Sequence, residues 1–137
     1  MNRPRETQVP DRRPLVAIVD DDASIREATH NLLDAAGFAT ASFGSAQAFL
    51  ESPWRRKASC LVSDVRMPGM TGLELHLELA ASGHPIPTVL ITAHQDDAVR
   101  LQARRAGIKC YLGKPFSPEQ LCRCVRTAIA SRATPKS

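Results

Sequence analysis

Charged or hydroxyl side chains stand at the ends of four short, mainly apolar segments of this 137-residue chain. They are Asp20 and Asp21 after residues 15–19, Asp64 after residues 60–63, Thr92 after residues 89–91 and Lys114 after residues 108–112. Short continuous apolar runs are typical of strands buried on both faces, as in a parallel sheet. Ligands of such sheets bind beyond the carboxyl ends of the strands. We therefore expect three carboxylates, one hydroxyl and one amine to meet at one rim.

This combination of residue types indicates phosphoryl transfer. Carboxylates held close together repel one another, and each raises the pKa of its neighbours. A hard divalent cation relieves that repulsion, and Mg²⁺ takes oxygen ligands while leaving room for a phosphoryl group. Lys114 would neutralise phosphoryl oxygens, and Thr92 could donate a hydrogen bond to one. Asp64 stands alone at the end of its run, so we predict that it is the nucleophile.

Each aspartate taken singly has a simpler explanation, since one Asp after a strand is usually a loop residue or a helix cap. We assign the capping role to Asp22, with a capping box of Ser24 and Glu27 as the alternative. The set of positions on successive strands is much harder to explain as chance.

Helical patterns separate the strands, and they predict a parallel sheet covered on both faces. Residues 38–43 form a second, weaker strand, residues 45–51 a short helix, and residues 96–107 a helix capped by Asp96. The helix before Gly37 has five inward residues, which are Ile25, Ala28, Leu32, Leu33 and Ala36. The last helix opens at Ser117 and has four, which are Leu121, Val125, Ala128 and Ile129.

Residues 72–82 give two conflicting signals. Leucines at 73, 75, 77 and 79 alternate with polar residues, which favours a strand. Leu, Glu and Ala are strong helix formers and none is β-branched, which favours a helix. We predict a helix with Leu73, Leu77 and Ala80 facing inward.

Length and composition indicate one soluble domain, because hydrophobic residues are 43% and charged residues 23% of the chain. We expect a flexible tail over residues 1–14, the folded domain over residues 15–130 and a short tail over residues 131–137. The net charge of +4 lies in the two tails, while residues 15–130 hold 12 basic and 12 acidic groups. A folded basic face is therefore missing, and we predict no direct binding of nucleic acid.

We expect the protein to be cytoplasmic. No apolar run approaches the roughly 20 residues that span a bilayer, and residues 1–14 lack the apolar stretch of a secretory signal. The four cysteines, at 60, 110, 122 and 124, are interpreted as reduced, buried or half-buried fillers.

The motifs at the strand ends resemble the response-regulator receiver domain of two-component signalling. The matching segments are residues 18–22 (IVDDD), 63–72 (SDVRMPGMTG), 91–94 (ITAH) and 111–116 (YLGKPF). The Thr-Ala-His and Arg-Met-Pro motifs are most similar to the FixJ-type subgroup. The resemblance covers about residues 15–130, and it implies a five-stranded parallel α/β fold with strand order 2-1-3-4-5.

The resemblance also implies a role for each site residue. Asp64 would be the phosphorylated residue. Mg²⁺ would bind Asp21, Asp64 and the backbone carbonyl of Arg66, with Asp20 acting largely through water. Lys114 would pair with the acyl phosphate and precede a cis peptide bond to Pro115. Thr92 would bond the phosphoryl group, and Tyr111 would be the aromatic switch that follows it.

The function implied is a phosphorylation-activated signalling switch that is not an enzyme beyond its own phosphorylation and slow dephosphorylation. A histidine kinase or phosphotransfer protein would supply the phosphoryl group. The output surface would comprise the fourth helix, fifth strand and fifth helix, which would engage a protein partner or a second copy. The fourth helix and fifth strand carry a basic stripe made up of Arg100, Arg104, Arg105 and Lys109. This stripe is explained equally well as part of the output surface and as an ordinary solvated face.

Three alternatives stay open at this point. We predict a stand-alone receiver because the sequence ends at Ser137; the alternative is the excised receiver half of a DNA-binding response regulator. A Mg²⁺-dependent phosphohydrolase acting through an aspartyl phosphate is less favoured, because such enzymes want a second acid where Arg66 stands. A flavodoxin-like electron carrier is disfavoured by an aromatic content of 4%.

Overall fold

The five strands pair in parallel in the order β2-β1-β3-β4-β5, as predicted. The structure, a computed structural model, describes residues 13–133. The strands are β1 (Leu15–Val19), β2 (Ala39–Phe43), β3 (Cys60–Asp64), β4 (Thr88–Thr92) and β5 (Cys110–Gly113). The helices are α1 (Ala23–Ala35), α2 (Ala46–Leu50), α3 (Gly72–Ala81), α4 (Asp97–Arg105) and α5 (Pro118–Ala133), with a 3₁₀ turn, η2, at Pro53–Arg56.

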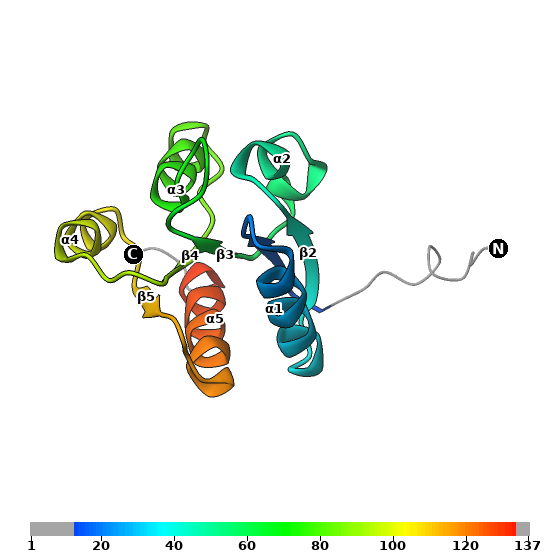
Figure 1. Ribbon diagram of the computed structural model, residues 1–137. Helices are drawn as coiled ribbons and strands as arrows, with labels where there is room; N and C mark the ends of the chain where they lie inside the picture. The colour runs from blue at the N-terminus through cyan, green and yellow to red at the C-terminus, as the bar shows by residue number, and fades with distance from the viewer. Residues whose placement is uncertain (1–12, 134–137) are drawn as a thin grey trace.

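The helices lie on both faces of the sheet, with α1 and α5 on one face and α2, α3 and α4 on the other (Figure 1). Strand order reverses direction at β1, because the chain first adds β2 on one side and then β3, β4 and β5 on the other. Crossovers between parallel strands share one handedness. The crossover that contains α1 therefore lies on the opposite face from those that contain α2, α3 and α4.

Successive strand residues point to opposite faces and supply both halves of the core. Val16 and Ile18 pack with Leu33 of α1 and Val125 of α5. Ala17 and Val19 belong to the opposite cluster, with Phe49 of α2 and with Leu75 and Leu79 of α3. The cysteines are free, and each is buried or half-buried, as the sequence predicted.

Helix α1 turns a slightly different face inward than predicted. Ala28 is exposed, whereas Thr29 is buried with Leu33. Thr29 lies four residues after Ile25 and four before Leu33, so it shares their side of the helix. Because Thr is polar, the pattern of apolar residues did not show that position 29 faces inward.

Helix α3 confirms the choice of helix over strand, and Leu73 packs against the core as predicted. The predicted inward positions of Leu77 and Ala80 were wrong. Its buried residues are Gly72, Leu75, His76 and Leu79, while Ala80 is exposed and Leu77 is 48% exposed. The structure gives the reason at Gly72, which packs directly on the backbone of Asp64. Once Gly72 faces the sheet, the positions three, four and seven residues later must face it too.

Helix caps account for the ends of several elements. Asp22 caps α1 by accepting from the N–H groups of Ser24 and Ile25, as predicted. Asp96 caps α4 in the same way, and Thr71 with Glu74 forms a capping box at α3.

The predicted tails lie largely outside the described residues. Of residues 1–14, only 13 and 14 are described, and the Pro14 carbonyl already accepts from the N–H of Ala39. Helix α5 continues to Ala133, past the boundary expected at residue 130, and residues 134–137 are outside the described range. Within residues 13–133, no helix has the length and apolar character needed to cross a bilayer.

Candidate functional site

The acidic residues lie at the point where the strand order reverses. Val19 of β1 is in register with Ser63 of β3, so Asp20 and Asp64 follow on neighbouring strands. In open α/β sheets this switch point, beyond the carboxyl ends of the strands, is where ligands bind. The topology therefore brings the predicted residues of β1 and β3 to one place.

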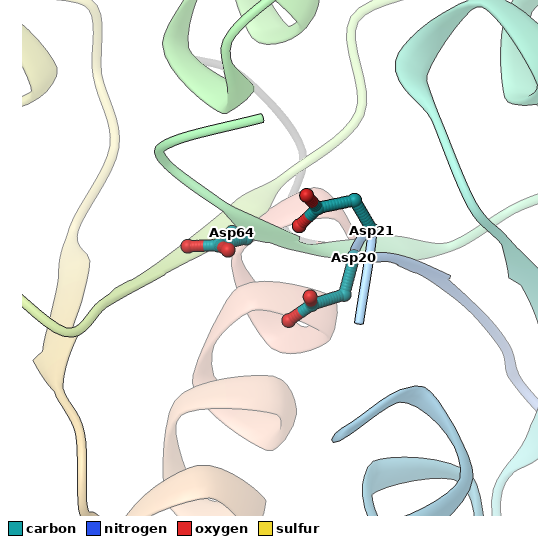
Figure 2. Close-up of side chains that lie close together, drawn as sticks. All are labelled: Asp20, Asp21 and Asp64. Carbon is teal, nitrogen blue, oxygen red and sulfur yellow. The ribbon is translucent and has the colours of Figure 1, made fainter. Parts of the chain in front are cut away.

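Asp20, Asp21 and Asp64 form a compact carboxylate cluster. One carboxylate oxygen from each residue lies within 4.8 Å of the others. Asp20 is buried, Asp64 is half-buried and Asp21 is exposed. Figure 2 shows the carboxylate of Asp21 turned towards Asp64 across the gap between the two strand ends. The cluster is thus closed below by Asp20 and open to solvent at Asp21.

Lys114 is the cation of the cluster. Its Nζ lies 3.5 Å from an oxygen of Asp20 and 3.7 Å from an oxygen of Asp64. The backbone N–H of Lys114 donates to the carbonyl of Thr92, which attaches the lysine to the end of β4. The following Lys114–Pro115 peptide is cis, as the resemblance implied. The lysine is therefore held beside the carboxylates of Asp20 and Asp64.

The pKa of the Asp64 carboxyl is raised above its ordinary value. Burial is the largest cause, and the negative charges of Asp20 and Asp21 act in the same direction. Lys114 opposes the shift, as does a hydrogen bond from the backbone N–H of Arg66. Asp64 is thus a carboxylate whose charge is incompletely compensated by the protein's own groups.

The cluster fits a hard divalent cation. Three carboxylates converge on one small space, and a single lysine cannot neutralise them all. Carboxylate and carbonyl oxygens are the ligands that Mg²⁺ prefers, and it typically uses few of them. Asp22 does not belong to this set, because its carboxylate caps α1.

Thr92 is at the same rim, but its hydroxyl is already bonded. The side chain is buried, and its Oγ1 donates to the carbonyl of His94 at 2.9 Å. The same oxygen accepts from the N–H of His94 at 3.1 Å. Thr92 therefore holds the start of the β4–α4 loop, and binding another acceptor requires that its bond to the His94 carbonyl break.

Tyr111 is half-buried and is connected to the beginning of α4. Its hydroxyl accepts from the N–H of Asp96, the α4 cap, at 3.4 Å. The guanidinium of Arg100 lies 4.9 Å from the centre of the ring, a cation–π contact. Tyr111 thus contacts both the cap of α4 and one residue of the basic stripe.

Several residues around the site were not singled out from the sequence. Ser63 is buried and donates to the carbonyl of Asp64, and Gly72 packs against that same carbonyl. Arg26 of α1 donates to the carbonyl of Asp20 at 2.6 Å. These contacts run from side chains or a bare Cα to backbone oxygens, so residue type and spacing carry no signal for them.

A family model for the response regulator receiver domain matches residues 16–126. The chain belongs to this family. Receiver domains are phosphorylated regulatory domains of two-component systems, they interact with histidine kinases and output domains, and they bind Mg²⁺ at acidic residues. The receiver assignment made from the strand-end motifs is therefore confirmed.

Curated relatives of this receiver include regulators from several bacteria. Transcriptional regulatory protein FixJ of Bradyrhizobium diazoefficiens is 39% identical over 114 residues, which cover 83% of this chain and 56% of that protein. Response regulator protein TmoT of Ectopseudomonas mendocina is 38% identical over 119 residues, covering 87% and 54%. The receiver thus spans about half the length of the curated relatives it matches.

Solved structures agree with the fold. The response regulator StyR matches with a TM-score of 0.81 and 42% identity, over 88% of this chain and 61% of that one. The FixJ-N structure matches with a TM-score of 0.77 and 32% identity, over 90% and 98%. The sheet order and the FixJ-type resemblance predicted from the sequence are both confirmed.

Proposed function

We propose that this receiver is a signalling switch operated by phosphorylation of Asp64, with the phosphoryl group supplied by a histidine kinase or phosphotransfer protein. The observation that carries the proposal is the position of Lys114 Nζ, 3.7 Å from Asp64, beside a carboxylate cluster that is open at Asp21. A half-buried carboxylate can act as the nucleophile that receives a phosphoryl group, and the cation beside it offsets part of the added negative charge.

In the proposed reaction, a carboxylate oxygen of Asp64 attacks the phosphorus of a phosphohistidine. The new O–P bond forms as the N–P bond of the donor breaks, and the imidazole keeps that electron pair. Lys114 neutralises charge on the transferred group. Asp21, Asp64 and the backbone carbonyl of Arg66 would hold Mg²⁺, with Asp20 acting largely through water. When bound, Mg²⁺ supplies further neutralisation of phosphoryl oxygens.

The signal would leave the site through Thr92. Its hydroxyl would exchange the His94 carbonyl for a phosphoryl oxygen, which moves the start of the β4–α4 loop. Tyr111, bonded to the α4 cap and stacked on Arg100, would follow. The output surface would be the α4–β5–α5 face. Reversing a 1:99 conformer ratio takes roughly 5.5 kcal/mol of differential stabilisation, which new bonds from Thr92 and Lys114 contribute to.

Receiver domains act as regulators. We propose that this chain catalyses only its own phosphorylation and its own slow dephosphorylation. The phosphohydrolase alternative is disfavoured because Arg66 stands where a second acid would be wanted. We further propose that the α4–β5–α5 face binds a downstream protein or a second copy of the chain, and that the protein acts in the cytoplasm. The predicted stand-alone status and the absence of nucleic-acid binding stay predictions.

Phosphorylation with a small donor tests the proposal. The protein is incubated with Mg²⁺ and acetyl phosphate, and its intact mass is measured. Wild type should gain one phosphoryl group that acid and base both remove, and Asp64→Asn should gain none. Asp34→Asn is the matched control, because Asp34 is exposed on α1 and pairs with Arg13. Equal labelling of wild type and Asp64→Asn would remove Asp64 from its proposed role.

A further inference from the structure

Arg26 is a cation bonded to the backbone of Asp20, the buried member of the carboxylate cluster. It lies in the first half of α1, and its side chain is half-buried. Its Nη1 donates a hydrogen bond of 2.6 Å to the backbone carbonyl of Asp20, rather than pairing with a carboxylate. The contact is therefore directed at the backbone of the site.

The bonded carbonyl belongs to the peptide unit that joins Asp20 to Asp21. A peptide unit is planar, so fixing its oxygen sets the direction in which the chain enters Asp21. The N–H of Asp20 donates to the carbonyl of Phe43 at 3.1 Å. The Asp20 carboxylate accepts from the N–H of Asp22 at 2.9 Å and pairs with Lys114. Arg26 thus completes the set of partners that orient Asp20.

Gly44, in the loop after β2, also lies close to the Arg26 guanidinium. A Cβ atom at Gly44 would lie 3.3 Å from Nη1 of Arg26, which is a tight contact. The missing side chain at Gly44 leaves room for the guanidinium where it meets the Asp20 carbonyl. Two segments, α1 and the β2–α2 loop, therefore determine where this cation sits.

We propose that Arg26 is a positioning residue for the metal-binding carboxylates, holding the Asp20–Asp21 peptide so that the Asp21 carboxylate faces Asp64. This role rests on the proposed function only in that Asp21 binds a divalent cation. Arg26 contacts no reacting atom, and it acts through the backbone of its neighbour.

A purely electrostatic effect of Arg26 would change Mg²⁺ affinity in the opposite direction to a positioning effect, so an experiment can distinguish the two. The guanidinium is bonded to the backbone of Asp20, and a positive charge there repels an incoming Mg²⁺, so removing the charge should tighten Mg²⁺ binding. Loss of positioning should weaken it, because the Asp21 carboxylate is then free to leave the cluster. The direction of the change in Mg²⁺ affinity therefore distinguishes a positioning group from a bystander charge.

The experiment measures the Mg²⁺ dissociation constant of unphosphorylated protein by calorimetric titration. Arg26→Met removes both the charge and the hydrogen bond, and it should weaken Mg²⁺ binding by about tenfold or more, the effect typical of outer partners of metal ligands. Arg26→Lys keeps a charged donor and should recover part of the affinity. Arg126→Met is the control, because Arg126 on α5 stacks on Phe38 and should leave Mg²⁺ binding unchanged.

A second variant covers the case in which Arg26→Met fails to fold. Gly44→Val keeps the charge of Arg26 but crowds its guanidinium, so it should also weaken Mg²⁺ binding. Hydrogen exchange at the amides of Asp21 and Asp22 is also measured without Mg²⁺. It should be faster in either variant than in wild type.

Unchanged or tighter Mg²⁺ binding by Arg26→Met, or by Gly44→Val if the first variant is unfolded, would overturn the positioning role. If wild type is phosphorylated and binds Mg²⁺ in that case, the proposed function stands and only Arg26 is misassigned. If wild type binds no Mg²⁺, both the metal site and the role of Arg26 are wrong.

Discussion

Gly72 and Asp64 are in direct contact across the β3–α3 loop: a Cβ atom at Gly72 would overlap the carbonyl oxygen of Asp64. It would also lie 2.8 Å from Oγ of Ser63, the residue that donates to that same carbonyl. The first residue of α3 therefore packs on the backbone of the residue proposed to be phosphorylated. Any side chain at Gly72 must displace either the helix or the end of β3.

Gly72→Ala should consequently destabilise the fold. Ala is favoured over Gly inside helices by up to about 1 kcal/mol, whereas overpacking typically costs about 1–3 kcal/mol. We expect a net loss measured by urea unfolding. Gly44→Ala is the control, because its nearest neighbour is the flexible end of Arg26. If Gly72→Ala is as stable as wild type, the close contact at Asp64 is not rigid.

Mg²⁺ should stabilise the folded protein, because the unfolded chain does not gather the three carboxylates. A ligand at 100 times its dissociation constant adds about 2.7 kcal/mol. The melting temperature of wild type should rise with Mg²⁺ concentration. Asp21→Ala should lose this dependence, and without metal it should melt higher than wild type because one repulsive charge is gone. Asp34→Ala should keep the dependence, and a wild-type melting curve indifferent to Mg²⁺ would exclude the metal site.

The raised pKa of Asp64 predicts how stability depends on pH in metal-free protein. The folded state holds the Asp64 proton at pH values where the unfolded chain, with an ordinary Asp pKa of about 3.9, has lost it. Stability contributed by this group is therefore lost as pH rises through that interval. Asp64→Asn has no carboxyl group to titrate at this position and does not lose this stability. The difference in unfolding free energy between the variant and wild type should therefore shift in favour of the variant as pH rises, and then level off. Urea unfolding in EDTA measures it, and an advantage that grows towards low pH would contradict the sign.

Thr92→Ala should separate phosphorylation from signalling. Asp64 and Lys114 remain, so the variant should still be labelled by acetyl phosphate. Hydrogen exchange of residues 93–116 should respond to the phosphoryl mimic beryllofluoride in wild type, respond little in Thr92→Ala and not respond in Asp64→Asn. Thr92→Ser keeps the hydroxyl and should restore the response. Rapid turnover of phosphate esters, with residues 93–116 unaltered, would instead favour the phosphohydrolase alternative.

Strands and site carboxylates were accessible from the sequence because their signals are local. A run such as 15–19 is apolar throughout, and the charged residue that follows it marks both the end of the strand and the rim. Parallel pairing then brings the carboxyl ends of all strands to one edge of the sheet. The sequence alone was therefore enough to predict that Asp20, Asp64 and Lys114 lie together, as they do in the structure.

The inner face of α5 was predicted correctly, since Leu121, Val125, Ala128 and Ile129 all pack in the core. The inner face of α3 and several backbone contacts were decided only by the tertiary structure. The leucines of α3 fit two helical faces equally well, and the contact of Gly72 with Asp64 selects the one with Leu75 and Leu79 inward. The same holds for Arg26, whose partner is a carbonyl oxygen that every residue possesses. A periodic pattern specifies how residues are spaced along an element, but only packing against a neighbouring element specifies which side of it is buried.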